Sequence, residues 1–188
     1  MAGVCDCFPE LKITTDAREQ RYRAHPDKSA PEGPQSTVQV KINSIGQLNE
    51  LVETRSGYKF IISEPRHVGG QLIAPTPLEF LLSGAVGCYA AVFAFYAAKM
   101  GVSYNSFEAT ASANFDVRGH MMPDAPPSNF QTVTIAITVA SDAPEDKLKE
   151  IERLALAGCP GIATLRNPVA VESTLKVEHT RVAEKRRA

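Results

Sequence analysis

The chain has 188 residues, of which 44% are hydrophobic and 22% are charged, and its formal net charge at pH 7 is −1. This length fits one domain with a tail, and the apolar content is sufficient for a hydrophobic core. A nearly neutral chain gives no electrostatic reason to expect nucleic acid or an acidic partner. We find no secretory signal near the N-terminus, so the expected location is cytoplasmic, where structural disulfides are rare.

The first 36 residues are expected to form a tail, because residues 25–36 are rich in Pro, Ser, Gly and charge. Such a stretch buries too little apolar surface to offset the entropy lost on ordering. We therefore predict a disordered tail at 1–36, a folded domain at 37–178 and a charged C-terminal tail at 179–188. Cys5 and Cys7 on the first tail are interpreted as incidental rather than as a metal or redox clip.

Three short strands are predicted at Thr37–Ile42, Leu48–Thr54 and Tyr58–Ser63. The long apolar segment Pro77–Lys99 follows, and residues 80–98 within it carry no charge. This length matches a membrane span, so a membrane-anchored protein is one interpretation. The glycines and alanines of the segment, and the strand patterns on both sides, favour instead a core helix covered by a sheet or by a second subunit.

Two further segments, Tyr104–Val117 and Gln131–Val139, alternate between apolar and polar residues, which predicts an antiparallel hairpin. Asp142 with Glu145 has the form of a capping box, and an amphipathic helix is expected after it. A last strand is predicted at Val169–Val177, with three residues facing inward: Val169, Val171 and Leu175. The order β-β-β-α-β-β-α-β predicts an α+β domain.

Cys88 and Cys159 are the candidate functional residues. Cys88 lies within the apolar segment, where a free thiol usually packs as a small hydrophobe. Cys159 precedes Pro160, which suits the first turn of a new helix and would place the sulfur near its N-cap, where a thiolate is stabilised. A pair of thiols on two helices is also what a two-cysteine peroxidase requires, because one is oxidised to a sulfenic acid and the other resolves it as a disulfide.

Residues 37–177 resemble the OsmC/Ohr family (osmotically inducible protein C / organic hydroperoxide resistance). Four segments carry the resemblance, and their order and spacing are more specific than any one of them: Pro65-Arg66-His67-Val68-Gly69-Gly70, Pro77 to Cys88, Asp116-Val117-Arg118-Gly119, and Cys159-Pro160 after an amphipathic helix. The resemblance implies an intertwined homodimer in which the long central helices are packed between sheets.

The resemblance also implies a cysteine-based peroxidase that reduces organic hydroperoxides to alcohols. Cys88 matches the peroxidatic cysteine of the family, and Cys159 matches the resolving one. An external dithiol would restore the reduced enzyme, and no metal or other cofactor is implied. We also expect the Cα atoms of the two cysteines to approach the roughly 4.4–6.8 Å that a disulfide requires.

Two departures from the family pattern weaken the expected activation of the thiolate. Leu78 stands where the peroxidase members have a glutamate, and the early loop lacks their arginine. Arg66, Arg55 and Glu79 are the candidates to support the thiolate, although Glu79 lies nine residues before Cys88, close to the opposite helical face. Without its cation a thiolate loses the interaction that lowers its pKa. The alternative hypothesis is therefore an OsmC-like dimer with little or no peroxidase activity that binds a small apolar or thiol ligand at the subunit interface.

Overall fold

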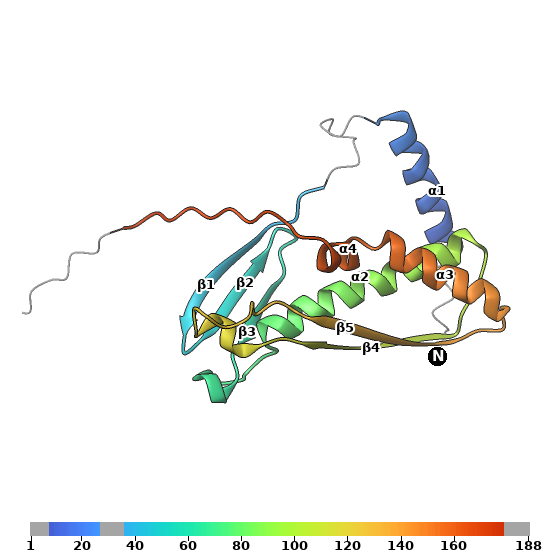
Figure 1. Cartoon of the computed structure of the whole chain (residues 1–188). Helices are drawn as coiled ribbons and strands as arrows, with labels where there is room; N and C mark the ends of the chain where they lie inside the picture. Colours follow the sequence, from blue (N-terminus) through green and yellow to red (C-terminus); the bar gives the residue numbers. More distant parts are fainter. Residues whose placement is uncertain (1–7, 27–35, 179–188) are drawn as a thin grey trace, which may run out of the picture.

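The structure is a computed structural model that describes residues 8–26 and 36–178 (Figure 1). One long helix, α2 (Pro77–Lys99), runs through its centre. A three-stranded sheet lies at one end of α2, and a two-stranded hairpin lies along one side. Helices α3 (Glu145–Gly158) and α4 (Pro160–Arg166) lie along the opposite side (Figure 1). This combination of small sheets and helices confirms the predicted α+β class.

Helix α2 has the limits that the sequence predicts, and a reciprocal cap fixes its start. The Thr76 hydroxyl accepts a hydrogen bond from the Glu79 N–H at 3.3 Å, and the Glu79 carboxylate accepts one from the Thr76 N–H at 2.7 Å. This capping box satisfies two backbone donors that have no partner within the helix. Pro77 follows at the first helical position, where its fixed φ favours the helix and its missing N–H is not needed.

The described residues bury mainly one stripe of α2. Its members recur every four residues, Ala85, Tyr89, Phe93 and Ala97, and Ala98 beside the last of them is also buried. Within the most apolar stretch of 18 residues in α2, 22% of the residues are buried. By length and composition alone α2 could cross a membrane, a test that the central helix of a soluble protein also passes. A second subunit is predicted to cover the remaining apolar surface, and this stays a prediction.

The N-terminal sheet has the strand order β1-β2-β3, with β1 at Val40–Gly46, β2 at Asn49–Thr54 and β3 at Lys59–Ser63. All pairs are antiparallel, and the predicted strands are confirmed to within a few residues. The Phe60 ring stacks on Phe80 of α2 with 4.8 Å between centroids. This contact fixes the sheet to the first turns of the central helix.

The predicted hairpin is confirmed as β4 (Ser106–Asn114) and β5 (Thr132–Ala140). Half-buried and exposed residues alternate along the whole length of both strands. The half-buried side packs on the core around α2, where the Phe107 ring lies 5.1 Å from that of Phe93. The two-residue period of the sequence therefore selects the face that covers α2.

Helix α3 begins later than the sequence predicts. The expected capping box of Asp142 and Glu145 is wrong, because Pro144 is the N-cap residue. Pro144 has an extended backbone (φ −56°, ψ 140°), and the position before a proline disfavours the helical conformation, so the helix begins only after it. The predicted amphipathic helix is confirmed, since Ile151 and Ala155 on its inner face are fully buried.

Helix α1 (Phe8–Ala24) corrects the prediction of a disordered tail over these residues. Four charged side chains form ion pairs one helical turn apart, Lys12 with Asp16 and Glu19 with Arg23, each at 2.6 Å. Leu11 packs against the core cluster around α2. The ion pairs within α1 and its packing on the core therefore stabilise a helix that the polar composition of the segment does not predict. Residues 1–7, 27–35 and 179–188 lie outside the described residues, and the limits of the predicted domain stay a prediction.

The predicted strand at Val169–Val177 is wrong as an element of the single chain. Residues 167–178 are extended and make no strand pair with the described residues. The side chains that the sequence places inward are exposed: Val169 by 63%, Val171 by 89% and Leu175 by 87%. The segment runs out from α4 past the sheet (Figure 1). It has the side-chain alternation of a strand but no neighbouring strand among the described residues.

Candidate functional site: a thiol pair

The two predicted cysteines come from different elements that meet at the centre of the molecule. Cys88 is half-buried in the middle of α2. Cys159 is fully buried between α3 and α4, where its extended backbone (φ −76°, ψ 119°) makes it the N-cap residue of α4. Pro160 occupies the first position of α4, which confirms the predicted helix start. Both thiols are free.

Gly161 makes the approach of the two elements possible. A Cβ atom at position 161 would lie 3.0 Å from the Ala85 Cα and 3.1 Å from the Cys88 Cβ. These separations are shorter than ordinary van der Waals contact, so any larger residue at position 161 would push α4 and α2 apart by a few tenths of an ångström or more. Across this contact Cys88 is a close neighbour of the Cys159 thiol and influences its pKa. Whether the pair can reach disulfide geometry stays a prediction.

Burial raises the pKa of the Cys159 thiol. The backbone N–H groups of Ile162 and Gly161 act in the opposite direction, without forming a capping hydrogen bond to the side chain. The neighbouring Cys88 raises the pKa of Cys159 further, both as a hydrogen-bond partner and as a charge. Cys159 is therefore a neutral thiol near pH 7. Of the two sulfurs, Cys88 is the one with solvent access for attack on a substrate.

The three residues expected to support a thiolate lie elsewhere in the single chain. Arg55 and Arg66 are exposed and follow opposite ends of the N-terminal sheet. Within the described residues neither guanidinium forms a hydrogen bond or an ion pair. The Glu79 carboxylate is engaged by Thr76, which lowers the pKa of Glu79, and nine residues of helix separate it from Cys88 by about 13 Å along the axis. The supporting roles of these residues stay predictions.

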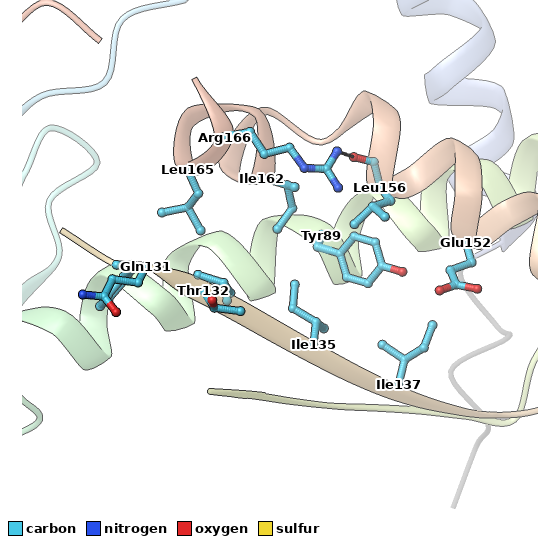
Figure 2. A pocket seen from close by; sticks show the side chains of 12 residues that line it. Tyr89, Gln131, Thr132, Ile135, Ile137, Glu152, Leu156, Ile162, Leu165 and Arg166 are labelled. Carbon is cyan, nitrogen blue, oxygen red and sulfur yellow. Dashed lines mark hydrogen bonds between the residues drawn. The ribbon is translucent and has the colours of Figure 1, made fainter. Parts of the chain in front are cut away.

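A pocket of about 350 Å³ lies between β5, α2, α3 and α4 (Figure 2). Neither cysteine lines this pocket, but Tyr89 directly follows Cys88 and Ile162 lies three residues after Cys159. Its walls are apolar and polar in similar measure. The apolar part includes Ile135, Ile137, Leu156, Ile162 and Leu165, and the polar part includes Thr132, Glu152 and Arg166. The Tyr89 ring forms part of the wall, and Figure 2 shows its hydroxyl directed towards the side of Glu152. Burial, with the Glu152 charge, raises the pKa of Tyr89 to about 12, so the phenol stays protonated and can donate a hydrogen bond.

Gly161 and most of the pocket residues are not predicted from the sequence. A glycine directly after Cys159-Pro160 is a usable signal, since glycine in a helical segment often marks close backbone contact. No local sequence pattern marks Tyr89, because the pocket exists only where α2, α3, α4 and β5 pack together. Within residues 8–26 and 36–178, no group of three His, Cys, Asp or Glu side chains could hold a metal ion. Cys5 and Cys7 lie outside the described residues.

Replacing Gly161 by valine is expected to separate the thiols. The added side chain must displace α4 from α2, so we expect disulfide formation to slow by about tenfold or more, and the protein to lose roughly 1–3 kcal/mol of stability through overpacking. Mass spectrometry of alkylated protein after one equivalent of peroxide gives the rate, and urea unfolding gives the stability. Ala163→Val is the matched control, because Ala163 is exposed on the same helix. Equal oxidation rates in the Gly161 variant and the wild type would contradict the role of this contact.

Comparison with known proteins places this site in a recognised fold. Residues 69–174, more than half of the chain, match the model of the family described as OsmC-like protein. An OsmC-like protein from Mycoplasma pneumoniae is similar in structure, with a TM-score of 0.61 and 15% identity over 70% of this chain and 89% of that one. An organic hydroperoxide resistance protein from Legionella pneumophila gives a TM-score of 0.55 and 20% identity over 70% and 90%.

An organic hydroperoxide resistance protein from Elizabethkingia anophelis gives a TM-score of 0.54 and 16% identity, over 70% of this chain and 89% of that one. At these identities the structural likeness shows the fold alone. The comparison with curated proteins gives no match. The family match spans α2, which carries Cys88, the hairpin of β4 and β5, and helices α3 and α4, between which Cys159 lies. The chain therefore belongs to the OsmC-like protein family.

Proposed function

We propose that this protein is a cysteine-based peroxidase that reduces organic hydroperoxides to alcohols. The observation that carries the proposal is the meeting of Cys88 and Cys159 across the contact of α2 with α4. Membership of the OsmC-like family supports it, and so do the structural neighbours named for organic hydroperoxide resistance. The pocket lined by Tyr89 and Ile162, which are near the two cysteines in the sequence, offers apolar side chains for the organic part of a substrate.

The proposed cycle has three balanced steps. The Cys88 thiolate attacks the terminal peroxide oxygen, the O–O bond breaks, and the alcohol leaves after taking up a proton, so that Cys88 becomes a sulfenic acid. The Cys159 sulfur then attacks the Cys88 sulfur, and a disulfide forms as water leaves. An external dithiol reduces this disulfide by two electrons and is itself oxidised. The high pKa of Cys159 suits the second role, because it leaves Cys88 as the first nucleophile.

The proposal includes a homodimer in the cytoplasm. Three exposed small residues line one side of α2, namely Gly84, Gly87 and Ala91. In the part of the chain that the structure describes, no other side chain or element lies within 4 Å of a Cβ placed at either glycine. A second copy of α2 could approach this side closely. The extended residues 167–178 offer an apolar strand face for the same partner. A dimer would also bring the partner's loops towards the thiols, which is where a missing cation could come from.

Peroxide consumption by the purified wild-type protein tests the proposal. With an excess of dithiothreitol, we expect repeated turnover of cumene hydroperoxide, and slower turnover of hydrogen peroxide, which lacks an apolar group to bury in the pocket. Peroxide loss is followed with a ferrous-iron dye assay, and a reaction without dithiol is the control. Dithiol-dependent consumption no faster than in buffer would contradict a peroxidase.

A binding protein without turnover is the second candidate, and one observation favours it. Among the described residues no cation acts on the pKa of Cys159, whereas the pocket lined by Tyr89 and Ile162 is already formed. Alkylation of Cys88 as a function of pH separates the candidates. A thiol that titrates near the free-cysteine value of about 8.5, together with absent turnover, would favour ligand binding over peroxide chemistry.

A further inference from the structure

Helix α1 and helix α2 enclose a second pocket, and the family match includes only one of its walls. The pocket has a volume of about 550 Å³, within the range of about 300–1,000 Å³ that is typical of small-molecule sites. One wall is formed by polar side chains of α1, and the other is formed mainly by Val92, Phe95 and Tyr96 of α2. The α2 wall lies within residues 69–174, whereas α1 precedes residue 69, so the polar wall is a feature of the chain outside the matched family segment.

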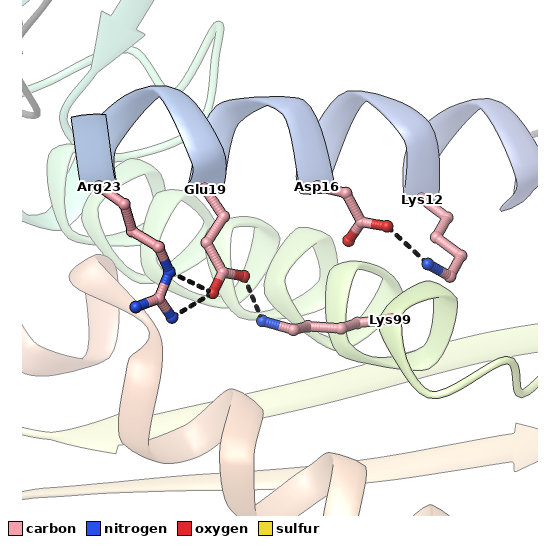
Figure 3. Close-up of polar contacts among 5 residues, drawn as sticks. All are labelled: Lys12, Asp16, Glu19, Arg23 and Lys99. Carbon is pink, nitrogen blue, oxygen red and sulfur yellow. Dashed lines mark hydrogen bonds and ion pairs between the residues drawn. The ribbon is translucent and has the colours of Figure 1, made fainter. Parts of the chain in front are cut away.

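Polar contacts hold α1 in place over α2 (Figure 3). The Glu19 carboxylate lies between two cations, 2.5 Å from the Lys99 Nζ of α2 and 2.6 Å from the Arg23 guanidinium. These two partners lower the pKa of Glu19 to about 2, so both ion pairs persist at neutral pH. Thr15, one turn before Glu19, is 3% exposed and lines the pocket. The ion pair of Glu19 with Lys99 and the burial of Thr15 therefore position α1 on α2.

The guanidinium of Arg18 lines the pocket and has no counter-ion among the described residues. Glu19 neutralises Arg23, but within residues 8–26 and 36–178 Arg18 forms no ion pair. Its one hydrogen bond is a long one, 3.4 Å, from the guanidinium to the Tyr22 hydroxyl, and the guanidinium carbon lies 5.9 Å from the Tyr22 ring. A guanidinium has five N–H donors, so most of its capacity remains for an anion. Tyr22 lies on the same wall and holds the cation at the rim.

The floor of the pocket is apolar and extends towards the thiol pair. Val92 follows Cys88 by one helical turn, and Pro160 adjoins Cys159. Phe95 continues the apolar surface away from the cysteines. A ligand that fits this arrangement has one anionic group at the rim and an apolar chain along the floor, because a carboxylate pairs well with a guanidinium and a chain gains from burial.

We infer that the pocket between α1 and α2 binds a small carboxylate with an unbranched apolar chain, with the carboxylate on Arg18 and the chain on Val92 and Phe95. The inference does not depend on peroxide chemistry. It predicts that affinity follows both the charge of the head group and the length of the chain. Each additional buried methylene contributes about 0.8 kcal/mol, which corresponds to roughly a fourfold gain in affinity.

Isothermal titration of the full chain with octanoate tests the inference. We expect saturable binding with one octanoate per chain, weaker binding of hexanoate, and weaker binding still of octanol and octyltrimethylammonium. Arg18→Gln should weaken octanoate binding by about fivefold, the order of effect of one exposed ion pair, and leave octanol binding unchanged. Arg18→Lys should restore part of the loss. Lys12→Gln is the matched control, because it removes the same charge from α1 at a position that does not line the pocket.

Three results would overturn the inference: equal affinity for octanoate and octanol, equal loss of affinity in the Arg18 and Lys12 glutamine variants, or no octanoate binding in the millimolar range. Flotation with anionic phospholipid vesicles separates a free carboxylate from a lipid surface. Vesicle binding without octanoate binding would overturn the small-molecule site and indicate a membrane contact. Far-UV circular dichroism of each variant shows that α1 is retained, so that a loss of binding is not a loss of the helix.

Discussion

Cys88→Ser is expected to reduce peroxide consumption to the uncatalysed background, in the presence or absence of dithiol. A serine hydroxyl at this position has no adjacent general base in α2 or α4 to activate it, and it cannot form the sulfenic acid on which the cycle depends. Cys88 is half-buried, so the substitution replaces sulfur by a smaller atom with little change in packing. Retained turnover in this variant would show that a different group attacks the peroxide.

Cys159→Ser is expected to give a different outcome. Attack by Cys88 does not require Cys159. In the absence of dithiol, one equivalent of peroxide should therefore be consumed per chain, after which Cys88 remains as sulfenic acid. A 1,3-diketone probe detects this species by its mass, and the wild type under the same conditions should show a disulfide instead. Identical products in the variant and the wild type would contradict the resolving role. The contrast between the two variants assigns the order of attack, which activity alone does not.

Loss of the dimer is the second large effect that we expect, and it concerns the extended residues 167–178. Val171 and Leu175 are 89% and 87% exposed and lie on one side of an extended backbone. Strand β5 pairs only with β4 among the described strands, so one of its edges has no partner. A strand from a second copy could pair with such an edge and bury these side chains, at roughly 1.5–3 kcal/mol each.

The double variant Val171→Asp with Leu175→Asp should therefore weaken the dimer by more than a hundredfold and give monomers at micromolar concentration. Sedimentation velocity measures the change. The control is Ala170→Asp with Thr174→Asp, which adds the same two charges to the alternate face of the segment. A wild-type protein that sediments as a monomer would contradict the dimer itself. Equal dissociation in both double variants would contradict the assigned face.

Segments with a strong internal pattern are predictable from the sequence. Helix α2 has its predicted limits because an uncharged run, a proline at the start and Lys99 at the end all mark the same element. Strands β4 and β5 follow from alternation alone. The segment at Val169–Val177 has the same alternation and is still not a strand in the single chain, because a strand also requires a partner, and the sequence does not show which chain supplies it.

The candidate site is predictable only in part, for a similar reason. The local surroundings of Cys88 and Cys159 identify both residues, but their contact joins segments that are far apart in the chain. It depends on the missing side chain of Gly161, and a single glycine gives no sign of what it touches. Helix α1 was missed because its stability comes from ion pairs and from α2, whereas its composition resembles a solvated tail.

The position of the thiol pair also affects the energetics of the proposed cycle. A bond between Cys88 and Cys159 would close a loop of 71 residues (159 − 88), and a loop of about this length stabilises a fold by roughly 4 kcal/mol through the unfolded chain. By thermodynamic linkage, the same free energy makes the bond harder to reduce in the folded protein than in the unfolded chain. At about 30 mV for each 1.4 kcal/mol, the reduction potential of the folded pair falls by roughly 90 mV. An efficient electron donor for this protein therefore has a correspondingly low potential of its own.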